Sequence, residues 1–195
     1  MSEKLDVKKS WDAYRARHRR FDIVDVPELQ YLMVDGHGDP NSAAFAEAVA
    51  ALYPVAYRLR SASRRALDRD YVVPPLEGLW WADDMASFTT ARDKSRWDWT
   101  LMILVPEWIG AALFAGVEGS DGVRLEALAE GRCVQTLHVG SFDDEGPVLA
   151  RLHDEVIPGH GLVPTGRHHE IYLGDFRRVP PERRRTILRQ PVRAA

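Results

Sequence analysis

The sequence predicts an α+β fold built from two similar halves, about residues 21–106 and 130–192. Each half has the pattern of a strand, a helix and two further strands, in the same order. Two such units pair into an antiparallel sheet as a pseudo-two-fold tandem repeat, with helices on one face and a central cleft. The 195 residues are expected to form one domain, 1–195, with residues 1–20 as an N-terminal arm or helix.

The first half begins with a strand pattern over residues 21–35, in which Pro27 requires a break or a sheet edge. An amphipathic helix follows and runs to about Arg60, and Pro54 inside it predicts a kink or an early end. The remaining elements are a connection at 61–70, strands at 71–82, 97–105 and 132–140, a helix at 148–156, and strands at 167–175 and 186–192.

The composition is that of an ordinary globular protein, with 45% hydrophobic and 28% charged residues. A formal net charge of −3 gives no general attraction to nucleic acid or to an anionic membrane. The N-terminus has no signal-peptide pattern, and no apolar run is long enough to span a bilayer. Cys133 is the only cysteine, which excludes an internal disulfide. A cytoplasmic location is therefore expected, without nucleic-acid or membrane partners.

The strand at 167–175 carries the main functional signal. Because side chains alternate along a strand, His168, Glu170 and Tyr172 share one face, and His169 belongs to the other face with two aliphatic residues. A carboxylate beside a phenol on an inner face attracts a cation or accepts a proton. The alternative is an exposed face on which both residues meet water.

A second group combines Glu77 with Trp80 and Trp81. Adjacent residues of a strand face opposite ways, so only one tryptophan lines a cleft, and Trp81 shares the face of Glu77 in a regular strand. Aromatic rings beside a carboxylate suit an organic cation or a flat ring. Two core tryptophans and a surface glutamate are the alternative.

The histidines do not have the spacing of a recognised zinc motif, and neither a metal nor another cofactor is expected. Cys133 lies in an apolar strand and is predicted to be an inert packed thiol. The arginine-rich C-terminal part is interpreted as a solvated face and comprises Arg177, Arg178, Arg183, Arg184, Arg185, Arg189 and Arg193.

Four ordered segments give the chain a family resemblance: Asp35–Asn41, Pro75–Trp81, Leu137–Gly140 and His168–Leu173. With these segments, the chain resembles the stand-alone GyrI-like small-molecule-binding proteins from about Lys4 to Val192. That family has the tandem strand–helix–strand–strand fold. Related domains are the effector-binding halves of multidrug-responsive regulators, in which a buried glutamate at the position of Glu170 meets lipophilic cations.

Unlike those regulators, the chain has no helix-turn-helix pattern, so the resemblance does not imply DNA binding. The first functional hypothesis is binding of flat, lipophilic, often cationic molecules. The predicted ligand-binding residues are Glu170, Tyr172, Glu77, Trp80, Trp81, His37, His138 and His168.

One stand-alone branch of the family resembles cyclopropanoid cyclopropyl hydrolases, which open a strained ring with water. That resemblance makes an enzyme the alternative: Glu170 activates water, Tyr172 orients it or stabilises charge developing on the ring system, and Trp80 or Trp81 stacks on the flat ligand. A protein-interaction module is a third possibility that rests only on the family's association with gyrase inhibition. The sequence leaves open whether the protein is a monomer or a homodimer.

Overall fold

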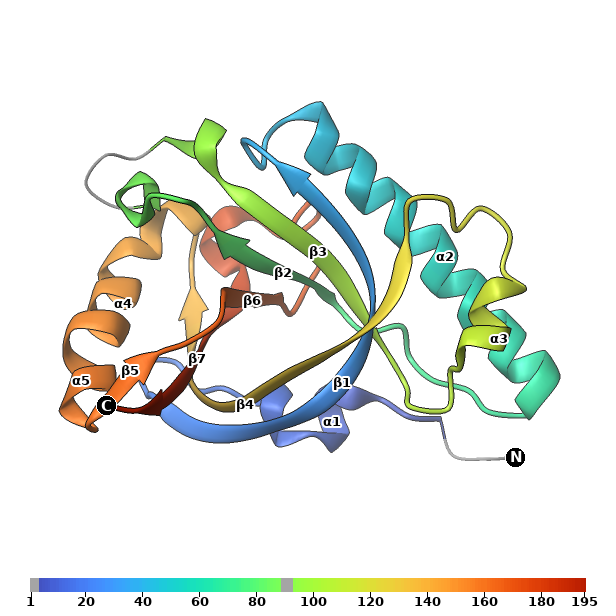
Figure 1. Cartoon of the computed structure of the whole chain (residues 1–195), viewed down its shortest axis with the longest axis horizontal. Coiled ribbons are helices and arrows are strands. Elements are labelled where there is room, and N and C mark those ends of the chain that lie inside the picture. Colours follow the sequence, from blue (N-terminus) through green and yellow to red (C-terminus); the bar gives the residue numbers. More distant parts are fainter. Residues whose placement is uncertain (1–3, 89–92) are drawn as a thin grey trace.

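A computed structural model describes residues 4–88 and 93–195 of the chain. Its strands are β1 (Asp22–His37), β2 (Leu76–Trp81), β3 (Asp98–Val105), β4 (Arg124–Val139), β5 (Leu162–Pro164), β6 (His168–Tyr172) and β7 (Arg185–Ala194). They form an antiparallel sheet in the order β4-β1-β3-β2-β6-β7-β5, and β4 also pairs with β7 (Figure 1). The expected α+β class with an antiparallel sheet is confirmed.

The helices are α1 (Val7–Ser10), α2 (Ala43–Leu67), α3 (Ala111–Ala115), α4 (Gly146–Ala150) and α5 (Ile157–Gly159), with a π-helical turn (Arg151–Val156) between the last two. Along the chain, α2 lies between β1 and β2, and α4 and α5 lie between β4 and β6. The first half therefore has the predicted order of strand, helix, strand, strand, whereas the second half has an additional short strand, β5, between its helices and β6.

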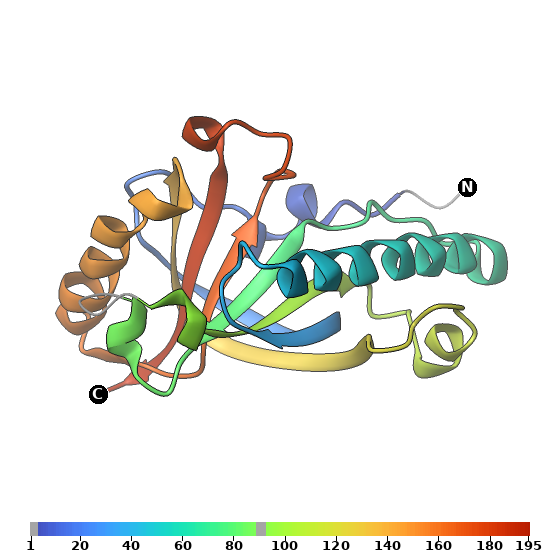
Figure 2. The same ribbon diagram turned by 90° about the horizontal axis from the view of Figure 1, so that it is seen from above.

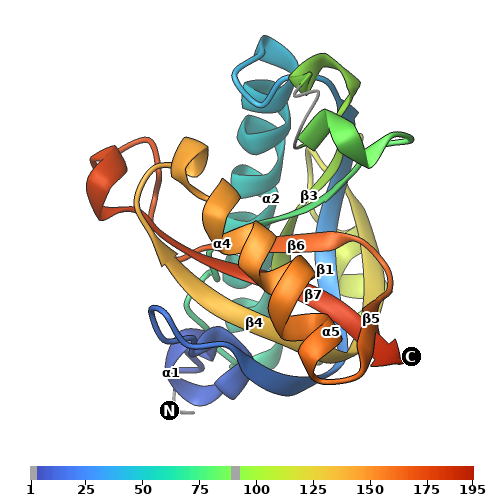
Figure 3. The same ribbon diagram turned by 90° about the vertical axis from the view of Figure 1, so that its left-hand side faces the viewer.

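The two faces of the sheet are covered differently. One face, here called the helical face, packs on α2 with Trp99 and Leu101, and on the π-helical turn and α5 with Val134 (Figures 2 and 3). The opposite face, here called the arm face, packs on the N-terminal segment with Leu79 and Ile171. In that segment the rings of Trp11 and Tyr14 lie 6.4 Å apart, and Tyr14 is buried. The N-terminal segment is thus part of the core.

The long helix α2 differs from the prediction. It continues through Pro54 to Leu67, so an end near Arg60 and a connection at 61–70 are wrong. A continuous buried stripe explains why burial overrides the local cost of proline, and it comprises Phe45, Ala48, Val49, Leu52, Val55, Ala56 and Leu59. Near the C-terminal end of the helix, the buried Ser63 hydroxyl donates to the Arg69 carbonyl and accepts from Trp108 Nε1.

Strand β1 runs without interruption past Pro27. This is tolerated because β3 begins to pair with β1 only at Gln30, so among the described residues β4 is the only strand beside β1 at Pro27. Strand β4 begins at Arg124, earlier than predicted, and β2 begins only at Leu76. Within residues 4–88 and 93–195, no helix combines the length and the apolar character needed to cross a membrane.

Candidate functional site

The register between β2 and β6 assigns the two glutamates to opposite faces of the sheet. Gly78 pairs with Glu170, while Glu77 pairs with Ile171. Because neighbouring residues of a strand point in opposite directions, Glu170 lies on the helical face and Glu77 on the arm face. The expectation that both carboxylates lie near one cleft is therefore wrong, although the predicted alternation along β6 is correct.

On the helical face, Glu170 ends a short chain of hydrogen bonds. Trp80 Nε1 donates to the Tyr172 hydroxyl oxygen at 3.1 Å, and the Tyr172 hydroxyl donates to Glu170 Oε2 at 2.8 Å. Burial, with the nearby charge of Glu170, raises the pKa of Tyr172 well above its ordinary value. Tyr172 therefore keeps its proton and acts as a hydrogen-bond donor to the carboxylate.

A glycine makes this arrangement possible. At Gly78, which faces Glu170 across the strand pair, an added Cβ atom would lie 2.9 Å from Trp80 Nε1 and 3.1 Å from the Tyr172 hydroxyl oxygen. Real Cβ atoms do not come that close without displacing a neighbour. Gly78 therefore provides the room in which the indole and the phenol meet.

Two histidines accompany the carboxylate. His168 Nε2 lies 3.5 Å from Glu170 Oε1, and the two side chains are 12% and 13% exposed. The ring of His153, from the π-helical turn, lies 6.4 Å from the His168 ring. Burial, followed by the charge of His168, lowers the pKa of His153 to about 4, so His153 is neutral at neutral pH.

Aromatic rings surround this group. Trp80 stacks on Phe45 with ring centroids 6.0 Å apart. Phe142 and Phe176 meet the Tyr172 ring edge-on at 5.6 and 5.8 Å. Beside Tyr172 is a hollow of about 120 Å³, lined by Phe142, Tyr172, Leu173, Gly174, Phe176, Val179, Arg183, Arg184, Arg185 and Thr186.

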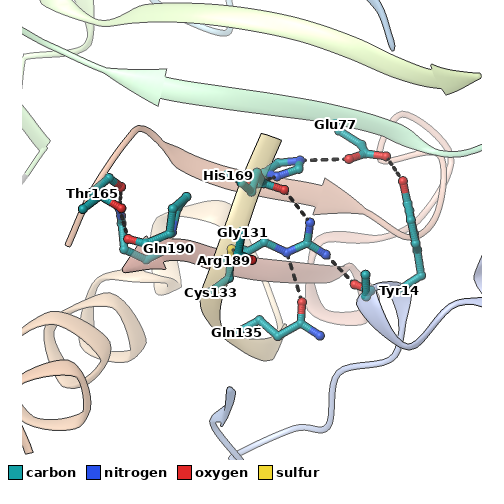
Figure 4. Close-up of polar contacts among 12 residues, drawn as sticks. Tyr14, Glu77, Gly131, Cys133, Gln135, Thr165, His169, Arg189 and Gln190 are labelled. Carbon is teal, nitrogen blue, oxygen red and sulfur yellow. Dashed lines mark hydrogen bonds and ion pairs between the residues drawn. The ribbon is translucent and has the colours of Figure 1, made fainter. Parts of the chain in front are cut away.

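Glu77 belongs to a buried network on the arm face (Figure 4). The Tyr14 hydroxyl donates to Glu77 Oε1, and His169 Nε2 lies 2.8 Å from Glu77 Oε2. The other ring nitrogen of His169, Nδ1, lies 2.9 Å from Glu130 Oε1. Since both nitrogens of this ring face carboxylate oxygens, both donate, and the ring is an imidazolium.

Arg189 completes the network. Its Nη1 donates to Glu130 Oε2 at 2.8 Å, its Nε donates to Gln135 Oε1 at 3.1 Å, and its Nη2 donates to the Ala13 carbonyl. The side chain is 0% exposed, so the interpretation of Arg189 as part of a solvated face is wrong. The guanidinium links β7 to the N-terminal segment.

The electrostatics of the network agree with its geometry. Burial alone lowers the pKa of His169, but the carboxylates of Glu130 and Glu77 outweigh it and raise this pKa to about 8. Burial raises the pKa of Glu130, but His169 and Arg189 outweigh that effect and lower it to about 2. At neutral pH the network therefore contains ionised, mutually paired groups.

The other predicted ligand residues lie away from Glu170 or already have partners. Trp81 is on the arm face, where the Arg167 guanidinium lies 3.5 Å from its ring centroid. His37 is exposed, with Nδ1 2.7 Å from Asp98 Oδ1. His138 is buried, and its Nε2 lies 2.9 Å from the Ser141 carbonyl oxygen.

Cys133 is fully buried, and burial raises the pKa of its thiol to about 12, in keeping with an inert packed cysteine. Across the described parts of the chain, no group of three or more His, Cys, Asp or Glu side chains is arranged to hold a metal ion.

The sequence interpretation missed Tyr14, Glu130 and Arg189 as members of one site. The available signal was a charged residue, Arg189, in a strand between the apolar pairs Ile187–Leu188 and Pro191–Val192. A buried guanidinium requires a carboxylate partner. That partner, Glu130, comes directly before Gly131, which has a positive φ of 65°.

The fold and the helical face define a small α+β ligand-binding domain, and comparison with known proteins agrees. The model of the GyrI-like small molecule binding domain matches residues 20–193. The chain therefore belongs to the GyrI-like family and has a small-molecule-binding domain. Comparison with curated protein sequences gives no match.

Three solved structures illustrate the relationship. An uncharacterized conserved protein from Listeria innocua is 37% identical, with a TM-score of 0.85 over 97% of this chain and 100% of that one. A hydrolase from the same organism is 34% identical, with a TM-score of 0.84 over 98% and 100%. The EcmrR C-terminal domain is 10% identical, with a TM-score of 0.59 over 90% and 98%, and so shares the fold.

Proposed function

We propose that the chain binds small, flat, lipophilic molecules, including cations, on the helical face beside Glu170. The observation that carries this proposal is the largely buried Glu170 carboxylate among aromatic rings. Within residues 4–88 and 93–195, Tyr172 is its one hydrogen-bond donor. A carboxylate in such a setting is costly to desolvate, and a bound cation or polar ligand group offsets that cost.

Four side chains are proposed to contact the ligand. Glu170 supplies the negative charge, Tyr172 holds that carboxylate in place, and Trp80 offers an indole face. His168 lies at the other carboxylate oxygen. Glu77 and Trp81 are excluded from this contact set because they lie on the opposite face of the sheet.

The size of the hollow limits how a ligand enters. About 120 Å³ beside Tyr172 is below the roughly 300 Å³ of typical ligand pockets. Phe142 and Phe176 occupy the space against the Tyr172 ring, and both lie outside the strands. We therefore expect a ligand to displace one or both phenylalanine rings and to take over their stacking contacts.

The test compares a planar cation with an uncharged molecule of the same shape. N-methylacridinium and anthracene are titrated into the wild type and Glu170→Gln, with tryptophan emission as the signal. The substitution should weaken binding of the cation by at least about tenfold and binding of anthracene by less than about threefold, because it removes only the charge of the side chain. The exposed Glu28→Gln serves as the matched control. Equal weakening of both molecules would contradict a charge role.

Hydrolysis is a second candidate function, favoured by similarity to two Listeria innocua proteins described as hydrolases. They are 34% and 35% identical and align along their full length. On this chain, Glu170 would accept a proton from water while the water oxygen bonds to a carbon of the cyclopropane ring. One C–C bond of the ring breaks, its electron pair moves to the electron-withdrawing group that activates the ring, and that group then takes up a proton. Tyr172 would fix the orientation of the carboxylate. The proposed substrate class is a cyclopropane-containing electrophile whose ring opens on addition of water.

Product formation separates the two candidates. The wild type is incubated with an excess of a cyclopropane-containing electrophilic natural product, and the hydrated, ring-opened product is measured by mass spectrometry. A hydrolase accumulates product in molar excess over protein, and Glu170→Gln abolishes this accumulation. Saturable binding without excess product would restrict the function to binding.

A further inference from the structure

His168 is a largely buried imidazole whose ring nitrogens have no hydrogen bond within the described part of the chain. Its side chain is 12% exposed, and both ring nitrogens are shielded from solvent. Neither nitrogen has a hydrogen-bond partner in the described parts of the chain. An unsatisfied buried polar group destabilises the folded state, so its presence calls for an explanation beyond packing. His169, the next residue, has a carboxylate at each nitrogen.

The surroundings of His168 show what it can interact with. The charged or titratable groups that face it are Glu170 on β6 and His153 on the π-helical turn, with Asp154 acting on His153. From the neighbouring strand β2, Trp80 pairs with His168 and carries no charge. Farther along the same face, Glu145 acts on Tyr172. Glu170 is therefore the one carboxylate within ion-pair distance of His168 in the described residues.

We propose that His168 is a specificity-determining residue of the ligand site, because its protonation state decides whether Glu170 is free to pair with a cation. A protonated His168 neutralises the carboxylate, and the site then favours an uncharged ligand. A neutral His168 leaves the negative charge for a cationic ligand. This inference rests on the proposed function, namely ligand binding beside Glu170.

His153 supports this role by its position. It lies on a π-helical turn, a rare geometry that is frequent at functional sites. Its pKa of about 4 keeps it uncharged near neutral pH, so it adds an imidazole beside His168 without adding a competing positive charge. His153 therefore stays neutral while ligand binding is varied around neutral pH.

If His168 has this role, the effect of pH on binding affinity depends on the charge of the ligand. A cation that pairs with Glu170 must displace the proton of His168, so cation binding releases a proton and strengthens as pH rises. An uncharged ligand does not compete with that proton. If His168 only filled space, its replacement would weaken cationic and uncharged ligands alike, and the pH dependence would remain.

The first experiment measures N-methylacridinium and anthracene binding between pH 5.5 and 8.5. In the wild type, cation affinity should rise at least about fivefold across this range, with anthracene changing less than about twofold. In His168→Gln, the rise above pH 6 should disappear, whereas the exposed His160→Gln should keep it. Binding in His168→Gln with an unchanged pH dependence would overturn the inference while leaving the proposed function intact.

A second measurement needs no ligand and remains decisive if neither molecule binds. The pH titration of the His168 ring is followed by nuclear magnetic resonance in the wild type and in Glu170→Gln. Loss of the carboxylate charge should move the His168 midpoint to lower pH by at least about half a unit, with His160 unchanged. An identical midpoint in both proteins would show that the two groups are not coupled and would overturn the inference.

Discussion

Two glutamate–histidine pairs lie on opposite faces of the sheet and have opposite surroundings: Glu77 of β2 with His169 of β6, and Glu170 with His168, both of β6. On the arm face, Glu77 and His169 have partners at every nitrogen and carboxylate oxygen. On the helical face, Glu170 and His168 are 3.5 Å apart, and both His168 nitrogens lack hydrogen bonds among the described residues. The residue types are the same, so the number of satisfied hydrogen bonds separates the structural pair from the proposed binding pair.

This difference indicates what each face contributes. A fully paired buried network holds elements together and penalises the loss of any member. An incompletely paired group costs stability and keeps its hydrogen-bonding capacity for a ligand. Because His168 and His169 are consecutive, one short strand links the two faces, and each histidine is a matched control for the other.

The largest expected effect comes from replacing each histidine with phenylalanine. His169→Phe removes the imidazolium that lies between the carboxylates of Glu77 and Glu130, although Glu130 keeps its ion pair with Arg189. It should lower the free energy of unfolding by about 3 to 5 kcal/mol. His168→Phe removes two unsatisfied nitrogens and should change it by less than about 1 kcal/mol. Urea unfolding of both variants measures the difference, and equal losses would contradict the contrast between the faces.

A smaller effect is expected at the N-terminal segment. Tyr14→Phe removes the hydrogen bond to Glu77 and should cost about 1.5 to 3 kcal/mol, since that bond ends on a buried carboxylate. Amide exchange should also accelerate around residues 11–15, which dock through this contact. Tyr57→Phe is the matched control because Tyr57 is 53% exposed. If Tyr14→Phe lowers the free energy of unfolding no more than this control does, the Tyr14–Glu77 hydrogen bond does not hold the N-terminal segment in place.

The pH dependence of stability should report the arm face. The folded pKa of His169, about 8, lies above the unfolded value of about 6.5, so the protonated ring stabilises the fold. This contribution is complete below about pH 6.5 and is lost as pH rises through about 8, for a total of about 2 kcal/mol. Urea unfolding at pH 6.5 and 9 measures this decrease in the free energy of unfolding, and the decrease should be absent in His169→Phe.

Much of the fold can be predicted from local sequence patterns, and the features that differ from the prediction depend on contacts between distant parts of the chain. Alternation predicts β6 and its two faces because strand geometry is a local property. The same local reasoning fails at Pro54, where burial along α2 outweighs the missing hydrogen bond. The family of the chain could also be predicted, because the four segments that carry the resemblance are contiguous in the sequence.

The candidate site is only partly predictable for a physical reason. Alternation places Glu170 and Tyr172 on one face, but the register that sets Gly78 opposite Glu170 depends on strand pairing across the fold. The network is still less local, since Arg189 reaches the carbonyl of Ala13 across 176 positions. No spacing rule connects such residues, so only the structure reveals that Glu77 has a histidine, a tyrosine and a second carboxylate around it.

The smallest expected effect on stability comes from replacing the Glu170 carboxylate with an amide. Glu170→Gln should change the free energy of unfolding by less than about 1 kcal/mol, because the amide oxygen still accepts from Tyr172. Urea unfolding beside the Glu28→Gln control measures this change. A loss of cation binding without a loss of stability would assign Glu170 to the ligand. A loss of about 3 kcal/mol would instead place Glu170 with Glu77, as a group that the fold itself requires.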